Sequence, residues 1–382
     1  MVEQRTENPR VGSSILPLAI PKSMKIGLLT GGGDAPGLNA VIRTAVLSAM
    51  NRGWEVVGIR HGFAGLLGQP DIMPMNRSTV SGIAHLGGTI LRTTNKGNPL
   101  CFPVRGEDGV VVEKDCTDEL IENVKRLGID ALVAIGGDGT LGIALQLVRR
   151  GLRIVGVPKT IDNDVSGTVS TFGFDTAVNT AIEAIDKLHT TAESHDRVLV
   201  LEVMGRNAGF IALHSGLAAT ADVILIPEIP YDIEKVCEKI RARDNAGHNF
   251  SIVVAAEGAY SKEDLTGHSA HTMEHRSIRA GSVVERLVQE IHERTGKECR
   301  SLVLGHLQRG GMPTGYDRLL ATRFGAAAIT AIANERWGEM VALQSPHLVT
   351  IPIEDVISEE KRVDLSHDLV QAARFTGISL GD

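Results

Sequence analysis

Two carboxylates stand two positions apart in the string PKTIDND, which spans residues 158–164 and follows an apolar, strand-like run. A Gly-rich string, GGDGT at residues 136–140, precedes it by about twenty positions. Carboxylates beside a loop that cradles phosphates predict phosphoryl transfer, in which Mg²⁺ must be held and an acceptor hydroxyl must lose its proton. A lone Asp-Asn-Asp more often caps a turn, so the prediction depends on the strings around Asp162 and Asp164.

The first Gly-rich string, GGGDAPGLN at residues 31–39, follows a predicted strand and opens a predicted helix. Its glycines let the backbone turn sharply and expose N–H groups, and the helix adds the positive end of its dipole, so an anion is the natural occupant. A nicotinamide cofactor is disfavoured, because the string lacks the GxGxxG spacing and the second predicted strand ends in Arg60 rather than an acidic residue. No GxxxxGK[ST] occurs, which excludes a P-loop NTPase.

Asp138, inside GGDGT, lies just before the predicted helix 141–150. Its carboxylate would lie beside backbone N–H donors, which suits a Mg²⁺ shared between protein and phosphate oxygens. An isolated Asp at such a position simply caps the helix about as often.

Apolar strands alternate with helical patterns along the chain, which predicts an α/β fold with doubly wound parallel sheets. Open sheets of this kind bind ligands at the carboxyl ends of their strands, so two Rossmann-like domains would place the active site in the cleft between them. The predicted strands are 25–30, 56–60, 131–135, 154–157, 198–203, 223–226, 251–256 and 302–304. The predicted helices are 38–52, 117–127, 141–150, 175–189, 232–243, 282–294 and 317–333.

Composition narrows the class of protein. A chain of 382 residues that is 43% hydrophobic is long enough for two domains. A net charge of −7 and 3% aromatic residues disfavour nucleic-acid binding. No apolar run approaches the ~20 residues of a membrane span, and the short run at 15–20 is broken by Pro17. We therefore expect a cytoplasmic protein whose residues 1–23 form a disordered extension. Four scattered cysteines without a CxxC motif predict reduced thiols and no zinc site.

Five strings occur in a defined order: GGGDAPGLN, GGDGT, PKTIDND, MGR at residues 204–206 and GHLQRGG at residues 305–311. In this order and spacing they closely resemble the 6-phosphofructokinase family, from about Lys25 to about Ala333. The resemblance implies a donor domain (24–173 plus about 308–358) and a sugar-phosphate domain (174–307 plus about 359–382). It also implies Mg²⁺ as cofactor, ATP as co-substrate, fructose 6-phosphate as substrate, and a homotetramer or homodimer with shared active sites.

On the donor side, the resemblance implies that Gly33 lies along the donor phosphates and that Asp138 binds the metal. Lys96 would substitute for an arginine that usually contacts the nucleotide. The remaining predicted donor residues are Gly137, Gly139 and Thr140.

On the acceptor side, the resemblance makes Asp162 the base that accepts the proton of the C1 hydroxyl. An ordinary Asp is ionised at pH 7, so this role needs no large pKa shift. Arg206 would neutralise the transferring group, while Lys159, Thr160 and Asp164 assist it. The predicted sugar-phosphate residues are Arg197, Met204, Gly205, Glu257, Arg300, His306 and Arg309. Guanidiniums suit phosphate and a carboxylate suits sugar hydroxyls, although His306 alone could equally be a packing histidine. In the family, residues matching Arg197 and Arg300 reach into a neighbouring subunit's site.

This chain departs from the family pattern in two ways, which concern the identity of the phosphoryl donor and the regulation of the enzyme. Pyrophosphate users in the family carry Asp where this chain has Gly139, which favours ATP here, whereas Lys159 is typical of pyrophosphate users. We give Gly139 more weight, because an Asp there would repel the α-phosphate. Arginines that bind effector phosphates in bacterial members are replaced by Leu47 and His189, so the usual control by phosphoenolpyruvate or ADP is not expected.

Three alternatives remain beside an ATP-dependent enzyme. A pyrophosphate-dependent enzyme would share the fold. A catalytically silent regulatory subunit would be expected to lose Asp138 or Asp162, and both are present. A dehydrogenase is least favoured, for the reasons given above for the first Gly-rich string.

Overall fold

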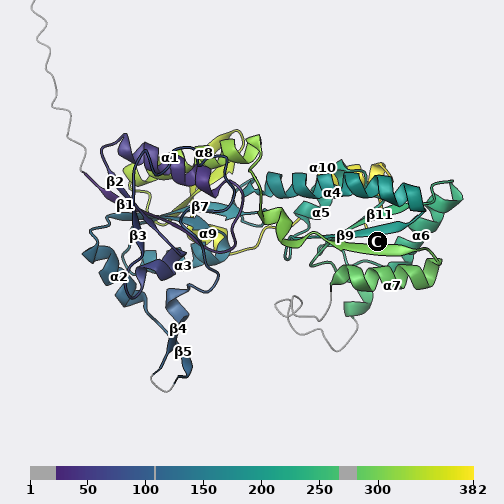
Figure 1. The fold of residues 1–382 in the computed structure, drawn as a ribbon, viewed down its shortest axis with the longest axis horizontal. Coiled ribbons are helices and arrows are strands. Elements are labelled where there is room, and N and C mark those ends of the chain that lie inside the picture. The colour runs from purple at the N-terminus through teal and green to yellow at the C-terminus, as the bar shows by residue number, and fades with distance from the viewer. Residues whose placement is uncertain (1–22, 107–108, 266–281) are drawn as a thin grey trace, which may run out of the picture.

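The computed structural model describes residues 23–106, 109–265 and 282–382. All but the last residue of the predicted extension 1–23 lies outside this part of the chain. The described residues form two α/β domains that lie side by side, each built on its own sheet (Figure 1). This arrangement confirms the predicted fold class.

The larger sheet has eight strands in the order β14-β13-β7-β6-β1-β2-β3, with the short β8 paired to β7. Its central strands are parallel, and the edge strands β3 and β14 are antiparallel to their neighbours. The strands are β1 (Lys25–Thr30), β2 (Glu55–Ile59), β3 (Ile72–Met75), β6 (Ala131–Gly136), β7 (Ile154–Thr160), β8 (Phe172–Gly173), β13 (Glu339–Gln344) and β14 (His347–Pro352).

Helices cover both faces of this sheet. One face packs against α1 (Leu38–Met50) and α8 (Gly315–Ala333), and the other against α2 (Thr117–Arg126), α3 (Asp138–Arg149) and α9 (Ile353–Ile357). Successive strand residues point to opposite faces, so Leu28 belongs to the first core and Leu29 to the second. Burial on both sides explains why β1 and β6 are almost wholly apolar.

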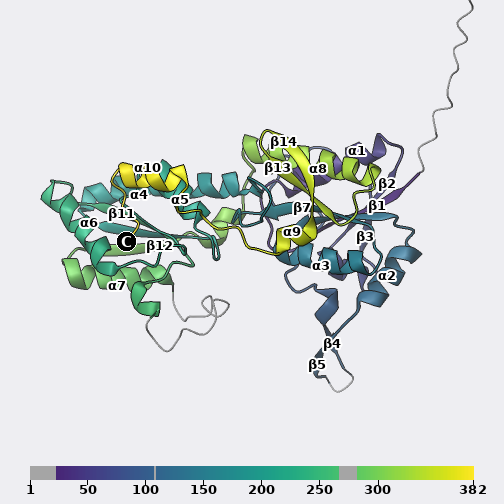
Figure 2. The ribbon, with the colours of Figure 1, turned by 180° about the vertical axis from the view of Figure 1, so that it is seen from behind.

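The smaller sheet is fully parallel, in the order β10-β11-β9-β12. Its strands are β9 (Val198–Val203), β10 (Val223–Leu225), β11 (Ser251–Ala256) and β12 (Cys299–Val303). As Figure 2 shows from behind, α4 (Phe174–His195), α5 (Phe210–Ala218) and α10 (Asp368–Phe375) cover one face, and α6 (Ile233–Asn245) and α7 (Val283–Thr295) the other.

The chain passes between the two domains three times: from β8 to α4, from η5 (Gly305–Arg309) to α8, and from α9 to α10. These crossings bring loops of both domains together. Arg309 of η5, for example, donates Nη1 to the carbonyl of Asp34 at 3.2 Å. Among the described residues, no helix combines the length and apolar character that a membrane span requires.

Most predicted elements are confirmed within a few residues, but several short ones were missed. The missed strands are β3, β8, β13, β14 and the hairpin β4 (Phe102–Arg105) with β5 (Val111–Lys114), and the missed helices are α5, α9 and α10. β3, β4, β5 and β14 are short, at a sheet edge or partly exposed, so their hydrophobic pattern is weak. The strand β13 and the helix α5 are apolar and mostly buried, and were missed all the same. The predicted strand 302–304 was wrong at its start, because β12 begins at Cys299 and pairs with β9 from there. Arg300 therefore lies within the strand rather than before it.

Candidate functional site

The loop after β1 packs directly against the start of α3. Gly31 donates its N–H to the carbonyl of Ile135 at 2.9 Å, which ties the loop to β6. A Cβ on Gly31 would lie 2.6 Å from Oγ1 of Thr140, and one on Gly136 would lie 2.4 Å from the same atom. Thr140 thus fills the space between the two Gly-rich strings, and both positions need glycine.

Helix α3 begins at Asp138, three residues before the predicted start, so Asp138 and Gly139 lie in its first turn. N–H groups in a first turn lack partners within the helix and lie at the positive end of its dipole. A Cβ on Gly139 would meet no atom of residues 23–106, 109–265 or 282–382 within 4 Å. The helix start therefore presents free N–H groups and open space to an anion.

The loop after β7 holds the paired carboxylates in the interior. Asp162 is only 2% exposed and Asp164 only 3% exposed. Thr160 Oγ1 accepts a hydrogen bond from the Asp162 N–H at 3.1 Å and donates one to Asp162 Oδ2 at 3.3 Å. The other carboxylate oxygen, Oδ1, is buried and has no partner within the described part of the chain. An acceptor held in this way is prepared to receive a proton from a bound hydroxyl.

Lys159 connects this loop to the loop after β1. It is buried at the end of β7, and its ammonium donates a hydrogen bond to the carbonyl of Gly33. Burial and the nearby guanidinium of Arg309 lower the pKa of Lys159 to about 8. A Cβ on Gly33 would lie 2.7 Å from Arg309 Nη1, so two cations converge on this glycine.

The loop after β9 carries the MGR string and is held from two sides. Glu257 Oε1 accepts the N–H of Arg206 at 2.9 Å, and Oε1 of the fully buried Gln308 accepts the N–H of Met204 at 2.9 Å. Gly205 has a φ of 149°, and a Cβ there would lie 2.5 Å from the carbonyl of Ala208. The tight turn aims Arg206 from the second domain, and Glu257 orients the turn.

Carboxylates and guanidiniums from both domains share one electrostatic environment. Burial, followed by the charge of Asp164, raises the pKa of Asp138 to about 7 and that of Asp162 to about 7. Burial likewise raises the pKa of Asp164. The role of Asp162 as a base required no large pKa shift, and the upward shift of its pKa is seen only in the fold, which shows how deeply the carboxylate is desolvated. The charges of Arg206 and Arg309 partly offset this effect at Asp162.

This donor set fits a Mg²⁺ that is shared with a phosphate. No group of three His, Cys, Asp or Glu side chains in the described residues is arranged to hold a metal ion by itself. Mg²⁺ is commonly bound through one or two carboxylates plus substrate phosphates and water. Asp138, beside the free N–H groups of α3 and electrostatically coupled to Asp164, provides such a partial site.

Arg197 and Arg300 lie away from this site within the chain. Arg197 directly precedes β9 and Arg300 is the second residue of β12, so both occupy the amino ends of parallel strands. The MGR loop follows the carboxyl end of β9, a strand of six residues, or roughly 20 Å, away. Both guanidiniums contact Glu298, Arg197 at 2.9 Å and Arg300 at 2.5 Å. The Arg300 side chain is 62% exposed.

Two further predicted residues, His306 and Lys96, lie at the surface. His306 is exposed in η5, two residues from the buried Gln308. Lys96 is exposed, and its N–H bonds to Oγ1 of Thr94, whose carbonyl accepts the N–H of Gly32 at 3.2 Å. The segment around Lys96 therefore lies beside the first Gly-rich loop, and the nucleotide contact of Lys96 stays a prediction.

Two residues near the site were missed in the sequence. Gln308 lies inside the GHLQRGG string. Its place directly before Arg309, a predicted site residue, was the signal that could have identified it. Glu360 lies beyond all five strings, yet its charge raises the pKa values of Asp138 and Asp164. No sequence signal pointed to Glu360, because the third crossing alone brings it to the site.

Two α/β domains, whose glycine loops, buried carboxylates and guanidiniums meet at the carboxyl ends of parallel strands, define a phosphotransferase-type site. Residues 25–332 match the family described as Phosphofructokinase. An ATP-dependent 6-phosphofructokinase of Chloroflexus aurantiacus is 52% identical over 361 residues, which cover 94% of this chain and 99% of the relative. The chain belongs to the phosphofructokinase family.

Other relatives extend this comparison. A pyrophosphate–fructose 6-phosphate 1-phosphotransferase of Streptomyces coelicolor is 48% identical over 344 residues, 89% of this chain and 96% of the relative. The solved phosphofructokinase of Saccharomyces cerevisiae superposes with a TM-score of 0.74 at 29% identity over 94% of this chain. This chain spans about half, 48%, of that yeast chain. High identity therefore occurs with relatives named for either phosphoryl donor.

Proposed function

We propose that this protein transfers the terminal phosphoryl group of ATP to the C1 hydroxyl of fructose 6-phosphate, forming fructose 1,6-bisphosphate. The observation that carries this proposal is the buried Asp162, whose Oδ1 finds no partner among the described residues while Thr160 holds its other oxygen. An acceptor hydroxyl beside Oδ1 would complete the hydrogen bonding of the carboxylate and lose its proton to it.

The donor is assigned to the Gly-rich loops of the first domain. Backbone N–H groups at the start of α3 and the loop around Gly33 bind its phosphates, and the ammonium of Lys159 lies against the same loop. Asp138 is the protein ligand proposed for Mg²⁺, which when bound neutralises phosphate charge. Gly139 leaves the space beside the helix start open, which supports ATP over pyrophosphate.

The second domain supplies the acceptor side. Arg206 neutralises charge on the phosphoryl group as it passes between the domains, and Arg309 contributes a second guanidinium from η5. Five further residues position the sugar phosphate or the side chains that contact it: Met204, Gly205, His306, Glu257 and Asp164. The bond from Glu257 to the Arg206 N–H supports an orienting role for this carboxylate. The proposed domain division remains 24–173 plus about 308–358 and 174–307 plus about 359–382.

If subunits share their active sites, Arg197 and Arg300 can bind substrate in the site of a neighbouring subunit. Both lie at the strand ends opposite their own site, as described above. Large apolar side chains are exposed along β12, η5 and the start of α8, namely Leu302, Val303, Leu307, Met312, Tyr316 and Leu319. Apolar surface beside a functional loop favours a protein interface. We therefore propose a cytoplasmic homo-oligomer, a dimer or a tetramer, in which the two arginines bind the neighbour's sugar phosphate.

The test is a coupled assay of fructose 1,6-bisphosphate formation with ATP and pyrophosphate compared side by side, each with Mg²⁺ and with EDTA. Activity with ATP and Mg²⁺, lost with EDTA, supports the proposal. Turnover with pyrophosphate but not with ATP would show that pyrophosphate is the donor. No turnover with either compound would overturn the proposed function.

A further inference from the structure

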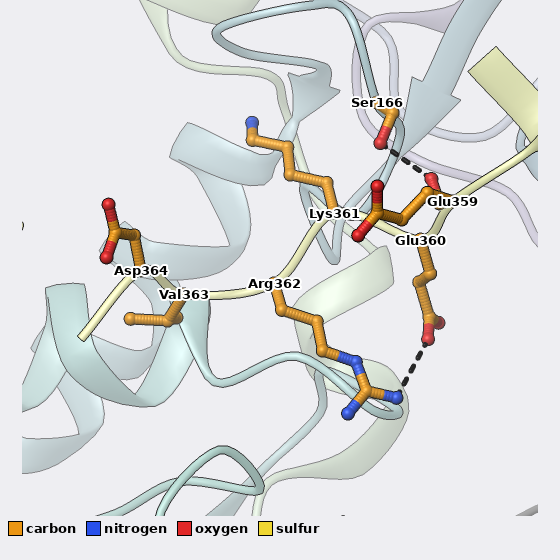
Figure 3. A pocket seen from close by; sticks show the side chains of 7 residues that line it. All are labelled: Ser166, Glu359, Glu360, Lys361, Arg362, Val363 and Asp364. Carbon is orange, nitrogen blue, oxygen red and sulfur yellow. Dashed lines mark hydrogen bonds and ion pairs between the residues drawn. The ribbon is translucent and has the colours of Figure 1, made fainter. Parts of the chain in front are cut away.

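The third crossing between the domains passes directly between the two catalytic loops. We call residues 359–363 the strap. Together with Ser166 and Asp364, the strap lines an open pocket of about 560 Å³ (Figure 3). The loop after β7 lies on one side of the strap and the loop after β9 on the other.

Hydrogen bonds join the strap to the loop after β7. The N–H of Lys361 bonds to the carbonyl of Asp164 at 3.0 Å. The Lys361 ammonium donates to the carbonyls of Thr168 at 3.0 Å and Val169 at 2.9 Å. Ser166 Oγ donates to the carbonyl of Glu359 at 2.6 Å, a bond that is visible in Figure 3. The strap is thus hydrogen-bonded to the loop that carries Asp162 and Asp164.

Other contacts join the strap to the loop after β9. Oε1 of Glu228 accepts the N–H groups of both Gly209, at 3.0 Å, and Val363, at 2.9 Å. Asn207, which follows Arg206, donates Nδ2 to Glu360 Oε1 at 3.3 Å. The Lys361 ammonium also lies 5.1 Å from the ring centroid of Phe210, at the start of α5. The strap therefore contacts the loop that carries the transfer arginine.

The charged group of Lys361 contacts both domains. Its ammonium bonds to carbonyls of the first domain and faces an aromatic ring of the second. Removing an ammonium from water is costly unless such partners replace the solvent. Burial lowers the pKa of Lys361 to about 8, in keeping with this desolvation. The backbone bonds alone would tether the strap, so the contacts of this half-buried ammonium need a further explanation.

We infer that Lys361 is a positioning residue for phosphoryl transfer, which fixes the loop of Asp162 and Asp164 relative to the loop of Arg206. The inference rests on the proposed function. The base and the guanidinium come from different domains, so their separation depends on the contacts between the loops. A misplacement of about 1 Å between reacting groups can cost about 10²-fold in rate. Lys361 itself touches neither substrate nor reacting atoms in this role.

The test compares Lys361→Met, which keeps the aliphatic stem, with Lys361→Arg, which keeps donors and charge. Lys235→Met is the matched control, because Lys235 lies on α6, in the second domain, and forms an ion pair with Glu238 of the same helix. For Lys361→Met we expect kcat per folded enzyme to fall at least ~10-fold, with KM for both substrates within ~3-fold of wild type. Lys361→Arg should recover most of the lost kcat, and Lys235→Met should behave as wild type.

Hydrogen exchange separates this inference from the proposed function, since it needs no turnover. In Lys361→Met, amide exchange should accelerate in both residues 162–169 and residues 204–210. Acceleration of both loops in a protein without kinase activity would overturn the proposed function and support the coupling. Exchange that changes in residues 162–169 alone, or an unchanged kcat, would overturn the inference.

A second variant covers the case in which Lys361→Met does not fold. Phe210→Leu removes the ring that faces the ammonium while keeping an apolar side chain at the start of α5. We expect kcat to fall roughly 3-fold and residues 162–169 to exchange faster, although the substitution lies in the other domain. Wild-type kcat and exchange in Phe210→Leu would count against Lys361 as a link between the loops.

Discussion

The buried ammonium of Lys159 donates a hydrogen bond to the carbonyl of Gly33, which joins the loop after β7 to the loop after β1. The carboxylates of Asp162 and Asp164 thereby keep a defined position relative to the proposed phosphate loop. The same glycine lies against Arg309, at the end of η5, where the chain crosses back from the second domain to the first. Gly33 thus fixes the proposed phosphate loop relative to both Lys159 and Arg309.

Replacing Asp162 by Asn tests the proposed base. The amide keeps the shape but cannot accept the proton, so we expect kcat to fall at least ~10²-fold while fructose 6-phosphate binding stays nearly unchanged. Kinetics with the coupled assay and binding by calorimetry measure the two effects separately. A variant that retains more than about a tenth of the wild-type kcat would remove Asp162 from this role.

Replacing Gly139 by Asp tests the donor. Because a Cβ at this position meets no atom within 4 Å in the described part of the chain, the variant should fold normally. Its effect should then arise from bulk and like charge beside the α-phosphate. We expect wild type to prefer ATP over pyrophosphate at least ~10-fold in kcat/KM, and Gly139→Asp to abolish ATP use. Pyrophosphate activity should persist or rise in the variant. Lys159→Met, which removes the other family marker, should reduce ATP use less than Gly139→Asp does.

Mixing two inactive variants tests the shared site. If Arg300 serves the neighbouring subunit, oligomers that combine Asp162→Asn with Arg300→Ala chains contain some sites with neither mutation. Activity should therefore reappear after co-refolding, and the measurement is specific activity against the ratio of the two chains. Mixed oligomers no more active than either parent would place the whole site within one chain.

Asp317 makes stability depend on pH. This fully buried carboxyl accepts bonds from the N–H of Thr176 at 2.8 Å and from its hydroxyl at 2.6 Å, yet burial raises its pKa to about 6. The raised pKa means that the folded state holds the proton more tightly than the unfolded chain does. The resulting stabilisation is full below about pH 4 and is lost as pH rises through about 6, about 3 kcal/mol in all.

Asp317→Asn removes this titration, because an amide stays neutral. Urea unfolding at pH 4.5, 6 and 7.5 should show a smaller loss of stability with rising pH in the variant than in wild type. The comparison is between the two proteins, so other titrating groups cancel. Parallel stability curves would show that the carboxyl of Asp317 is already ionised throughout this range.

The sequence by itself determined the α/β class, most core strands and the loops that carry the candidate site. The alternation of apolar strands with helices depends on local periodicity, and Gly31, Gly136 and Asp138 stand at the strand-to-helix turns where that periodicity changes. Local signals of this kind survive without knowledge of the fold. The assignment of chemistry to Asp162 and Arg206 depended on five strings in a defined order.

Only the tertiary structure decided how the distant segments meet. The desolvation of Asp162 depends on packing from many segments, so its raised pKa could not be derived from the string PKTIDND. The start of β12 at Cys299 is set by pairing with β9, and this pairing places Arg300 at the strand end opposite the site. Glu360 and Lys361 carry no motif at all. They reach the catalytic loops because the chain crosses between the domains a third time, and a contact between such distant segments leaves no periodic signal in the sequence.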